Sequence, residues 1–249
     1  MPALLQFTKV NMYFTGSPRA VHALHDVTFA LKRGEFLSVL GPSGCGKSTL
    51  LRLAAGLEVP TSGEVLYDGR LLDGPDRRRG FVFQSYNVFP WLTVRHNIAF
   101  GLNESESDNK PEKIKNWLEF TGLTEFADAY PKALSGGMRQ RLALARTMIV
   151  EPELLLLDEP FGALDERTKE GMQALLLQAV ALTGCAVIFV THDIQDAIFL
   201  ADRLVLLSKR PATILDVFTV SSPKPRPREF LRSEEFATLH EKLLDRFPV

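Results

Sequence analysis

Apolar and polar residues follow two different patterns along the chain. Short β-rich runs broken by turn residues, such as "YDG" and "LDGPDRRRG", fill residues 4–40 and 64–83, which predicts hairpins of an antiparallel sheet. Elsewhere, strand-like apolar runs alternate with turns and helical stretches. This alternation is typical of an α/β architecture. We therefore expect an α/β fold with an antiparallel β region near its beginning.

The middle of the chain, residues 91–150, has a helical pattern. In "EKIKNWLEFTG", Ile114, Trp117 and Leu118 recur at helical spacing and Gly122 supplies a C-terminal stop. Three apolar runs, "ELLLLDE", "CAVIFVTHD" and "ADRLVLLS", then predict strands of a parallel sheet. The tail "SSPKPRPREFLRSEEF" predicts an extended basic segment followed by a short amphipathic helix that ends near Phe247.

Composition and charge exclude several classes of protein. The 249 residues carry a formal net charge of −1, so no overall basic field favours nucleic acid as a partner. The longest apolar runs are much shorter than the roughly 20 residues that cross a bilayer, and the N-terminus does not resemble a secretory signal. The two cysteines have no metal-binding spacing, so we expect a reduced cytosolic compartment and no disulfide.

A glycine-rich segment follows the apolar run "EFLSVL" and precedes the helical pattern "STLLRLAAG". It matches G-x-x-x-x-G-K-[ST] through Gly41, Gly46, Lys47 and Ser48. Glycines let the loop turn its amides toward an anion, and the following helix adds its own unpaired amides. Lys47 is then expected to reach the β- and γ-phosphates, and Ser48 to ligate Mg²⁺.

The alternative is a glycine-rich turn that only links a strand to a helix. The flanking strand and helix favour a phosphate-binding P-loop over this alternative. The nucleotide-binding residues that we expect in this loop are Gly41, Pro42, Ser43, Gly44, Cys45, Gly46, Lys47, Ser48 and Thr49. Because Cys45 lies inside this loop, we expect alkylation to block activity and ATP to protect; the alternative is a small apolar filler turned away from the nucleotide, for which alkylation has no effect.

Two carboxylates end the apolar run "LLLLDEP". Ligands bind at the carboxyl ends of strands in open α/β sheets, and at a strand end both side chains can turn toward one pocket. Asp158 suits the hold on Mg²⁺ expected of a Walker B aspartate. Glu159 is then available to deprotonate a water for attack on the γ-phosphate. A plain turn or helix start is the alternative, which the glycine loop makes less favourable.

A second anion site is indicated by "LSGGMRQR", where Ser135 is a good N-cap and Gly136 and Gly137 leave amides open at the start of a helix. With the glycine loop and "LLLLDEPFGALD", this motif resembles the ABC transporter ATPase family, from about Leu5 to about Ile214. The resemblance implies a P-loop NTPase fold with a RecA-like parallel-sheet core, an N-terminal antiparallel β subdomain and an inserted helical subdomain. It also implies a head-to-tail pair of ATPase subunits, either a homodimer or a closely related heterodimer. Each ATP then lies between one subunit's Lys47 loop and the partner's 135–137 segment; the alternative is a plain capped helix.

The resemblance implies roles for other positions. Gln84 in "FVFQS" corresponds to the glutamine that contacts Mg²⁺ or the attacking water, and Asp165 in "GALD" to the aspartate at the dimer seam. His192 in "FVTHD" corresponds to the histidine that hydrogen-bonds the γ-phosphate. By register, Phe14 is the ring that stacks on adenine, but the adjacent Tyr13 is an equal structural candidate.

The resemblance also implies domain limits. We expect residues 1–220 to form one ATPase domain, in which 1–85 and 151–220 are the nucleotide-binding core and 86–150 an inserted helical subdomain. Residues 221–249 are expected to form a basic tail.

The sequence also resembles one branch of the family, that of the nitrate, sulfonate and taurine importers. This implies a separate transmembrane permease, and indirectly a periplasmic or lipid-anchored substrate-binding protein, with the ATPase at the cytoplasmic face of a bacterial inner membrane. Phe89 and Trp91 either line the groove that receives the permease or pack inside the helical subdomain.

Three alternatives remain open. A small-molecule kinase shares the glycine loop but has no use for "LSGG". An exporter usually fuses its membrane spans to the ATPase, although separate exporter subunits exist. An ABC ATPase that acts on nucleic acid is disfavoured by the charge balance, so we expect ATP and Mg²⁺ as cofactors and no nucleic-acid partner.

Overall fold

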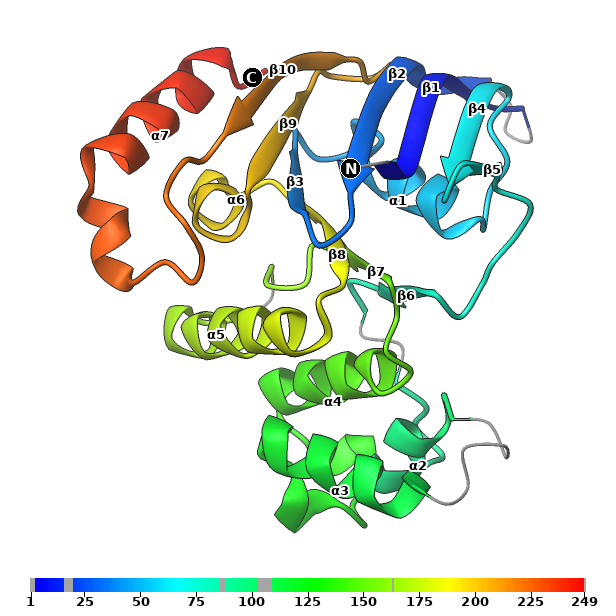
Figure 1. Ribbon diagram of the computed structural model, residues 1–249, viewed down its shortest axis with the longest axis vertical. Coiled ribbons are helices and arrows are strands. Elements are labelled where there is room, and N and C mark those ends of the chain that lie inside the picture. The colour runs from blue at the N-terminus through cyan, green and yellow to red at the C-terminus, as the bar shows by residue number, and fades with distance from the viewer. Residues whose placement is uncertain (1–2, 16–19, 86–87, 103–108, 163, 249) are drawn as a thin grey trace.

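Two sheets and two groups of helices make up the fold (Figure 1). The fold is that of a computed structural model, which describes residues 3–15, 20–85, 88–102, 109–162 and 164–248. The larger sheet has the strand order β10-β9-β3-β8-β7-β6, and the smaller one the order β2-β1-β4-β5.

The larger sheet is parallel except at one edge. Its strands are β3 Phe36–Leu40, β6 Arg79–Val82, β7 Leu154–Asp158, β8 Ala186–Thr191, β9 Arg203–Leu207 and β10 Ile214–Thr219. Only β10 pairs antiparallel, with β9. All residues of β3 and β8 are buried, because helices or the second sheet cover both faces, and this is why these segments appear as continuous apolar runs.

The smaller sheet is antiparallel, as the sequence predicts. It consists of β1 Ala3–Phe14, β2 Val21–Lys32, β4 Ser62–Tyr67 and β5 Arg70–Leu71. The sequence pattern was wrong about the ends of both the 4–40 and the 64–83 segments. At the end of the first, β3 pairs in parallel with β8 and β9. At the end of the second, β6 is no hairpin strand: it pairs in parallel with β7, Phe81 opposite Leu156. The partner lies far along the chain, so local turn residues do not reveal this pairing.

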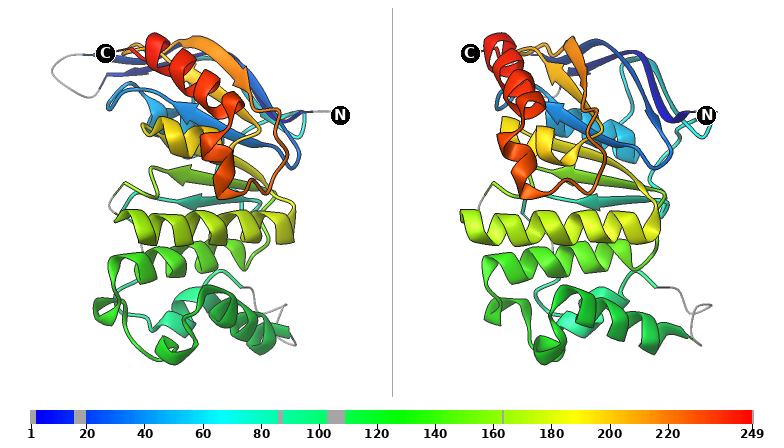
Figure 2. Two further views of the ribbon diagram at one scale, coloured as in Figure 1. Left: turned by 90° about the vertical axis from the view of Figure 1, so that its left-hand side faces the viewer. Right: turned by 60° about the vertical axis from the view of Figure 1, so that its left-hand side comes forward.

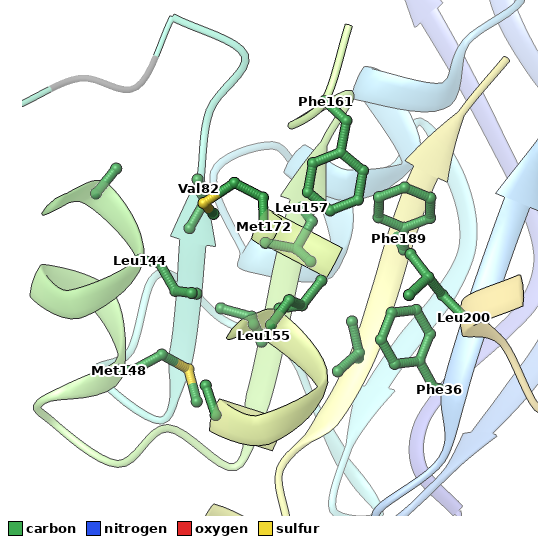
Figure 3. Close-up of a cluster of buried hydrophobic side chains, with 14 of the residues drawn as sticks. Phe36, Val82, Leu144, Met148, Leu155, Leu157, Phe161, Met172, Phe189 and Leu200 are labelled. Atoms are coloured by element: carbon green, nitrogen blue, oxygen red, sulfur yellow. The ribbon is translucent and has the colours of Figure 1, made fainter. Parts of the chain in front are cut away.

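Alternate residues of the central strands build two cores. Leu155 and Leu157 of β7 point to the helical side, where Met172 and Phe189 join them (Figure 3). Leu154 and Leu156 belong to the opposite cluster. That second cluster contains the smaller sheet and α1, Lys47–Ala55, so the larger sheet is a buried middle layer.

The helical region lies below the sheets in Figure 1. It contains α2 Val94–Ala99, α3 Lys110–Thr121 and α4 Gly136–Met148, with single 3₁₀ turns at Thr124–Phe126 and Pro131–Ala133. The prediction for α3 is confirmed: Gly122 ends the helix in the left-handed conformation, with a φ of 66°. Helix α4 runs beside α5, Glu166–Thr183, which covers the larger sheet (Figure 2).

The C-terminal tail packs on the core. A 3₁₀ turn at Arg228–Arg232 leads into α7, Glu234–Arg246, which confirms the predicted terminal helix and its end near Phe247. The preceding basic segment is less solvated than its composition suggests, because Arg226 is only 5% exposed. Its guanidinium donates to the carbonyls of Ile198 and Phe199 at the end of α6, Ile194–Leu200. Among the described residues, no helix is both long and apolar enough to span a bilayer.

Candidate functional site

The glycine loop joins the end of β3 to the start of α1. Gly46 begins the helix with a φ of 133° and no side-chain cap. A Cβ added there would lie 2.9 Å from both the Ala23 carbonyl oxygen and Leu24 Cδ2. Only glycine therefore fits, and the first amides of α1 stay open toward the loop. Together with the positive end of the helix dipole, they form an anion cradle.

Lys47 is almost fully buried, with 4% of its surface exposed. Its ammonium donates to the carbonyl oxygens of Gly41 at 2.8 Å and Pro42 at 3.1 Å. It also lies 3.2 Å from Glu159 Oε1. The loop, its lysine and the predicted base are thus in direct contact, although more than a hundred residues separate them in the chain.

The acidic pair sits at the carboxyl end of β7. Ser48 Oγ donates to Asp158 Oδ1 at 3.1 Å, and burial raises the pKa of Asp158. A hydroxyl and a carboxylate oxygen so close together are ligands that Mg²⁺ prefers. These two residues therefore fit the predicted metal site.

Glu159 has an unusual backbone. Its φ is +44°, and its amide donates to the carbonyl of Val190 on the neighbouring strand at 3.0 Å. A positive φ in a non-glycine residue costs of order 1 kcal/mol or more and is frequent at functional sites. This conformation turns the carboxylate toward a cavity of about 170 Å³, which Glu159 lines together with Gly44, Gly46, Lys47, Ser48 and Thr49.

His192 follows β8 directly. Its Nδ1 lies 3.2 Å from Glu159 Oε2, and its side chain is about half exposed, at 53%. Both side chains also line a second cavity, of about 200 Å³. The structure thus brings together Lys47, Ser48, Asp158, Glu159 and His192, as the sequence predicts.

Gln84 follows β6, the strand that pairs with β7, and makes no described contact with this group. It is exposed, two residues beyond the end of β6 at Val82. No described hydrogen bond joins it to Asp158 or Glu159. Its role toward Mg²⁺ or water stays a prediction.

The signature segment, "LSGGMRQR" at residues 134–141, contains the start of α4. Ser135 is exposed and accepts a hydrogen bond from the Met138 amide at 3.2 Å, as an N-cap does. An added Cβ would meet nothing within 4 Å at Gly136 but would lie 2.7 Å from Thr168 Cγ2 at Gly137. Among the described contacts, none joins this segment to the glycine loop of its own chain.

Asp165 caps α5 next to that segment. Its carboxylate accepts from the Thr168 amide at 3.1 Å and the Thr168 hydroxyl at 2.6 Å. These hydrogen bonds lower the pKa of Asp165. Asp165 and Ser135 are both exposed, so the capped starts of α5 and α4 are both accessible from outside the chain.

The two candidate adenine-stacking rings differ in exposure. Tyr13 is 42% exposed, and its ring stacks on His22 with centroids 3.9 Å apart. Phe14 is partly buried and packs against the smaller-sheet core. The exposed ring of Tyr13 is the more accessible of the two.

Cys45 lies within the loop, but its thiol points inward. It is 2% exposed and belongs to the core cluster around α1. Burial raises the pKa of the thiol. The structure therefore contradicts the expectation of ready alkylation and favours the apolar-filler alternative, which leaves only the backbone of Cys45 for phosphate contact.

Sequence reasoning missed a buried polar group beside His192. Lys169 of α5 lies 2.8 Å from Asp193 and 2.8 Å from Asp196. Asp196, 2% exposed, sits inside the apolar stretch "IQDAIFLA". A charged residue inside such a stretch was the available signal.

Comparison with known proteins agrees with this geometry. The profile of the ABC transporter family matches residues 24–162. The chain belongs to the ABC transporter family. The family assignment accounts for the glycine loop, the acidic pair and the signature segment in one chain, and with them for ATP binding and hydrolysis.

Curated relatives cover nearly the whole chain. It is 44% identical over 238 residues to the aliphatic sulfonates import ATP-binding protein SsuB of Bacillus cereus, covering 96% of this chain and 93% of that protein. It is also 44% identical over 240 residues to the nitrate import ATP-binding protein NrtD of Synechocystis, covering 93% and 90%.

Solved structures of the family share the fold. One is a dimeric ATP-binding cassette bound to ADP and phosphate after hydrolysis, with a TM-score of 0.76, 32% identity, and coverage of 88% of this chain and 100% of that one. Another is cbiO1 of Clostridium perfringens, part of the transporter complex cbiONQ, with a TM-score of 0.79, 26% identity, and coverage of 99% and 96%. The P-loop α/β fold predicted from the sequence is confirmed.

Proposed function

We propose that this chain is the ATP-hydrolysing subunit of an ABC importer for a small anion such as nitrate, a sulfonate or taurine. The observation that carries the catalytic part is the position of Glu159. Its two carboxylate oxygens lie 3.2 Å from Lys47 Nζ and 3.2 Å from His192 Nδ1. The names of the sulfonate and nitrate import proteins support the transport part.

Hydrolysis cleaves the bond between the γ-phosphorus of ATP and the oxygen that bridges it to the β-phosphate. The Glu159 carboxylate takes a proton from water while the water oxygen bonds to the γ-phosphorus, and ADP leaves with the bridging oxygen. General-base assistance of this kind is worth roughly 10²- to 10⁴-fold in rate. Lys47 and the loop amides hold the phosphates, and His192 donates to the γ-phosphate.

Ser48 and Asp158 are the residues that would hold Mg²⁺, with Gln84 as a further oxygen ligand. The ion supplies charge neutralisation on the β- and γ-phosphates. Ser48 and Asp158 are already hydrogen-bonded to each other at 3.1 Å, so the pair is oriented by the protein itself.

The second half of the site is proposed to come from another ATPase subunit. Ser135 and Asp165 are exposed, and among the described contacts none joins residues 135–137 to the glycine loop of their own chain. A head-to-tail pair would place them on the partner's ATP. The dimeric form of the solved cassette supports this arrangement.

A surface for the permease is proposed on the helical region, which we assign to residues 86–150. Trp91 and Phe100 are 69% and 63% exposed. Both contact Phe89, with ring centroids 5.4 and 4.4 Å apart. An exposed aromatic group of this kind favours a partner contact over internal packing for Trp91. The chain would then sit peripherally at the cytoplasmic face of the membrane, with a periplasmic or lipid-anchored binding protein delivering the solute on the other side.

The replacement Glu159→Gln tests the catalytic proposal. We expect retained ATP binding, a stable nucleotide-bound dimer and turnover lowered at least roughly a hundredfold. Glu125→Gln, an exposed carboxylate in the helical region, is the matched control and should hydrolyse ATP normally. Near-normal turnover of Glu159→Gln would remove Glu159 from the base role.

The transport proposal is tested separately by uptake in cells. Cells that lack this chain should lose uptake of the labelled anion, and the wild-type gene should restore it while Lys47→Ala does not. Nitrate, an alkanesulfonate and taurine are compared in parallel. Unchanged uptake of all three would overturn the proposed solute class and leave the ATPase assignment standing.

A further inference from the structure

A polar cluster behind His192 connects three separate parts of the chain. It consists of Lys169 and Gln173 of α5, Asp193 and Asp196 at the start of α6, and Arg228 of the tail. Lys169, Gln173 and Asp196 are 12%, 2% and 2% exposed. Ordering such buried polar groups is costly unless each is satisfied, and these are.

Lys169 is the centre of the cluster. Its single ammonium lies 2.8 Å from a carboxylate oxygen of Asp193 and 2.8 Å from one of Asp196. Burial lowers the pKa of Lys169, but its hydrogen bonds to the two aspartates outweigh burial and raise it. Lys169 therefore stays charged and holds both carboxylates at neutral pH.

Asp193 links Lys169 to His192. It directly follows His192, its amide donates to Thr191 Oγ1 at 3.0 Å, and its carboxylate accepts from the Asp196 amide at 3.0 Å as the cap of α6. The residue after His192 is thus fixed at its backbone and its side chain. Fixing Asp193 restricts the position of the His192 ring, which lies 3.2 Å from Glu159.

The far side of the cluster reaches the tail. Gln173 donates to Asp196 Oδ1 at 2.8 Å and accepts from Arg228 at 3.0 Å. Asp196 therefore keeps a second hydrogen-bond donor besides Lys169. Lys169 itself lies one helical turn after Asp165 and, with Asp193 and Asp196, lines the 200 Å³ cavity shared by Glu159 and His192.

We infer that Lys169 is a positioning residue for ATP hydrolysis, which holds His192 on Glu159 by anchoring Asp193 to helix α5. This inference rests on the proposed catalytic roles of Glu159 and His192. Because Lys169 touches neither phosphate nor water in this role, its loss should lower kcat and leave the KM for ATP unchanged.

A simple Lys169→Met replacement would leave Asp196 buried beside an apolar side chain and could unfold the protein. The test therefore uses the pair Lys169→Met/Asp196→Asn, in which no buried charge is left unpaired, against Asp196→Asn alone. Asp196→Asn keeps the contact of Lys169 with Asp193 and should hold kcat within about twofold of wild type. The double variant should lose about tenfold in kcat, with KM within about twofold and a similar Tm.

Two further variants keep the inference open to refutation if the double variant is unstable. Asp193→Asn retains a good N-cap but lacks the charge that Lys169 holds, so it should show the same selective loss of kcat. Lys169→Arg keeps the cation and should recover most of the activity. The inference is overturned if either Asp193→Asn or the folded double variant keeps kcat within twofold of wild type.

The outcome is separable from that of the proposed function. If wild type hydrolyses ATP and Glu159→Gln does not, the catalytic proposal stands whatever Lys169 does. If Glu159→Gln is active, the proposed roles fail and the Lys169 inference fails with them.

Discussion

The steric demand at Gly46 gives the sharpest stability prediction for the nucleotide loop. Gly46→Ala places a methyl group 2.9 Å from the Ala23 carbonyl oxygen and 2.9 Å from Leu24 Cδ2. Neither neighbour moves freely, because the Ala23 carbonyl accepts from the Ala212 amide at 2.9 Å and Leu24 is fully buried. The alanine must also adopt a φ of 133°.

The expected cost has two parts. The positive φ costs about 1–2 kcal/mol in a residue with a Cβ. Overpacking of a buried site adds about 1–3 kcal/mol. We therefore expect Gly46→Ala to lower the free energy of unfolding by about 2–5 kcal/mol.

Gly44→Ala is the matched comparison. Gly44 also has a positive φ, 74°, but a Cβ there meets nothing within 4 Å. Its replacement should cost only a left-handed backbone, about 1–2 kcal/mol. The difference between the two variants measures the overlap with Ala23 and Leu24 together with the further backbone cost of a φ of 133°, which lies outside the left-handed helical region.

Urea unfolding followed by circular dichroism measures both losses, provided that the two variants share the wild-type m-value. Binding of a fluorescent ATP analogue, measured in parallel, should be lost in Gly46→Ala and weakened at most in Gly44→Ala. Equal losses of stability in the two variants would show that the contacts of Gly46 do not constrain the loop as described.

Four further outcomes follow from individual side chains. Burial raises the pKa of Asp196 from 3.8 to about 6. Its contribution to stability is therefore complete below the pKa of the unfolded state and is lost as pH rises through about 6. Relative to Asp196→Asn, the wild type should gain about 1.4 kcal/mol of unfolding free energy from pH 7 to pH 5, measured by urea titration, and a difference that does not change with pH would contradict the shift. The buried thiol of Cys45 should react with iodoacetamide at the same rate with and without ATP, measured by mass spectrometry of the loop peptide. Strong protection by ATP would instead show that the thiol faces the nucleotide. Tyr13→Ala should raise the Kd for ATP more than Phe14→Ala does, by isothermal titration, and the reverse order would assign adenine to Phe14. Trp91→Ala should hydrolyse ATP in solution but fail to assemble with the permease in a pull-down. Leu182 is also highly exposed, so Leu182→Ala is the control and should assemble. Normal assembly of Trp91→Ala would exclude a contact between Trp91 and the permease.

The catalytic cluster was predictable because each of its residues ends or begins an element with a strong local pattern. Lys47 and Ser48 start a helix after a glycine loop, and Asp158 and His192 end or follow apolar runs. Parallel strands bring such ends to one edge, so sequence alone indicates that they meet. The distances from Glu159 to Lys47 and His192 needed the structure.

Other features depended on contacts that no local pattern encodes. The pairing of β6 with β7 joins segments more than seventy residues apart. Tyr13 and Phe14 could not be distinguished by alternation, because the register of β1 against β2 shifts between Met12 and Tyr13. Arg226 looked solvated in a proline-rich basic segment, yet it is buried against the end of α6, whose carbonyls need donors.

The ammonium of Lys47 is shared between the carbonyls of its own loop and the carboxylate of Glu159. A triphosphate that draws this ammonium away also releases the carboxylate from its counter-charge. Binding of ATP and activation of Glu159 as a base are then coupled. The carboxylate becomes free to accept a proton from water only when a γ-phosphate is present for that water to attack.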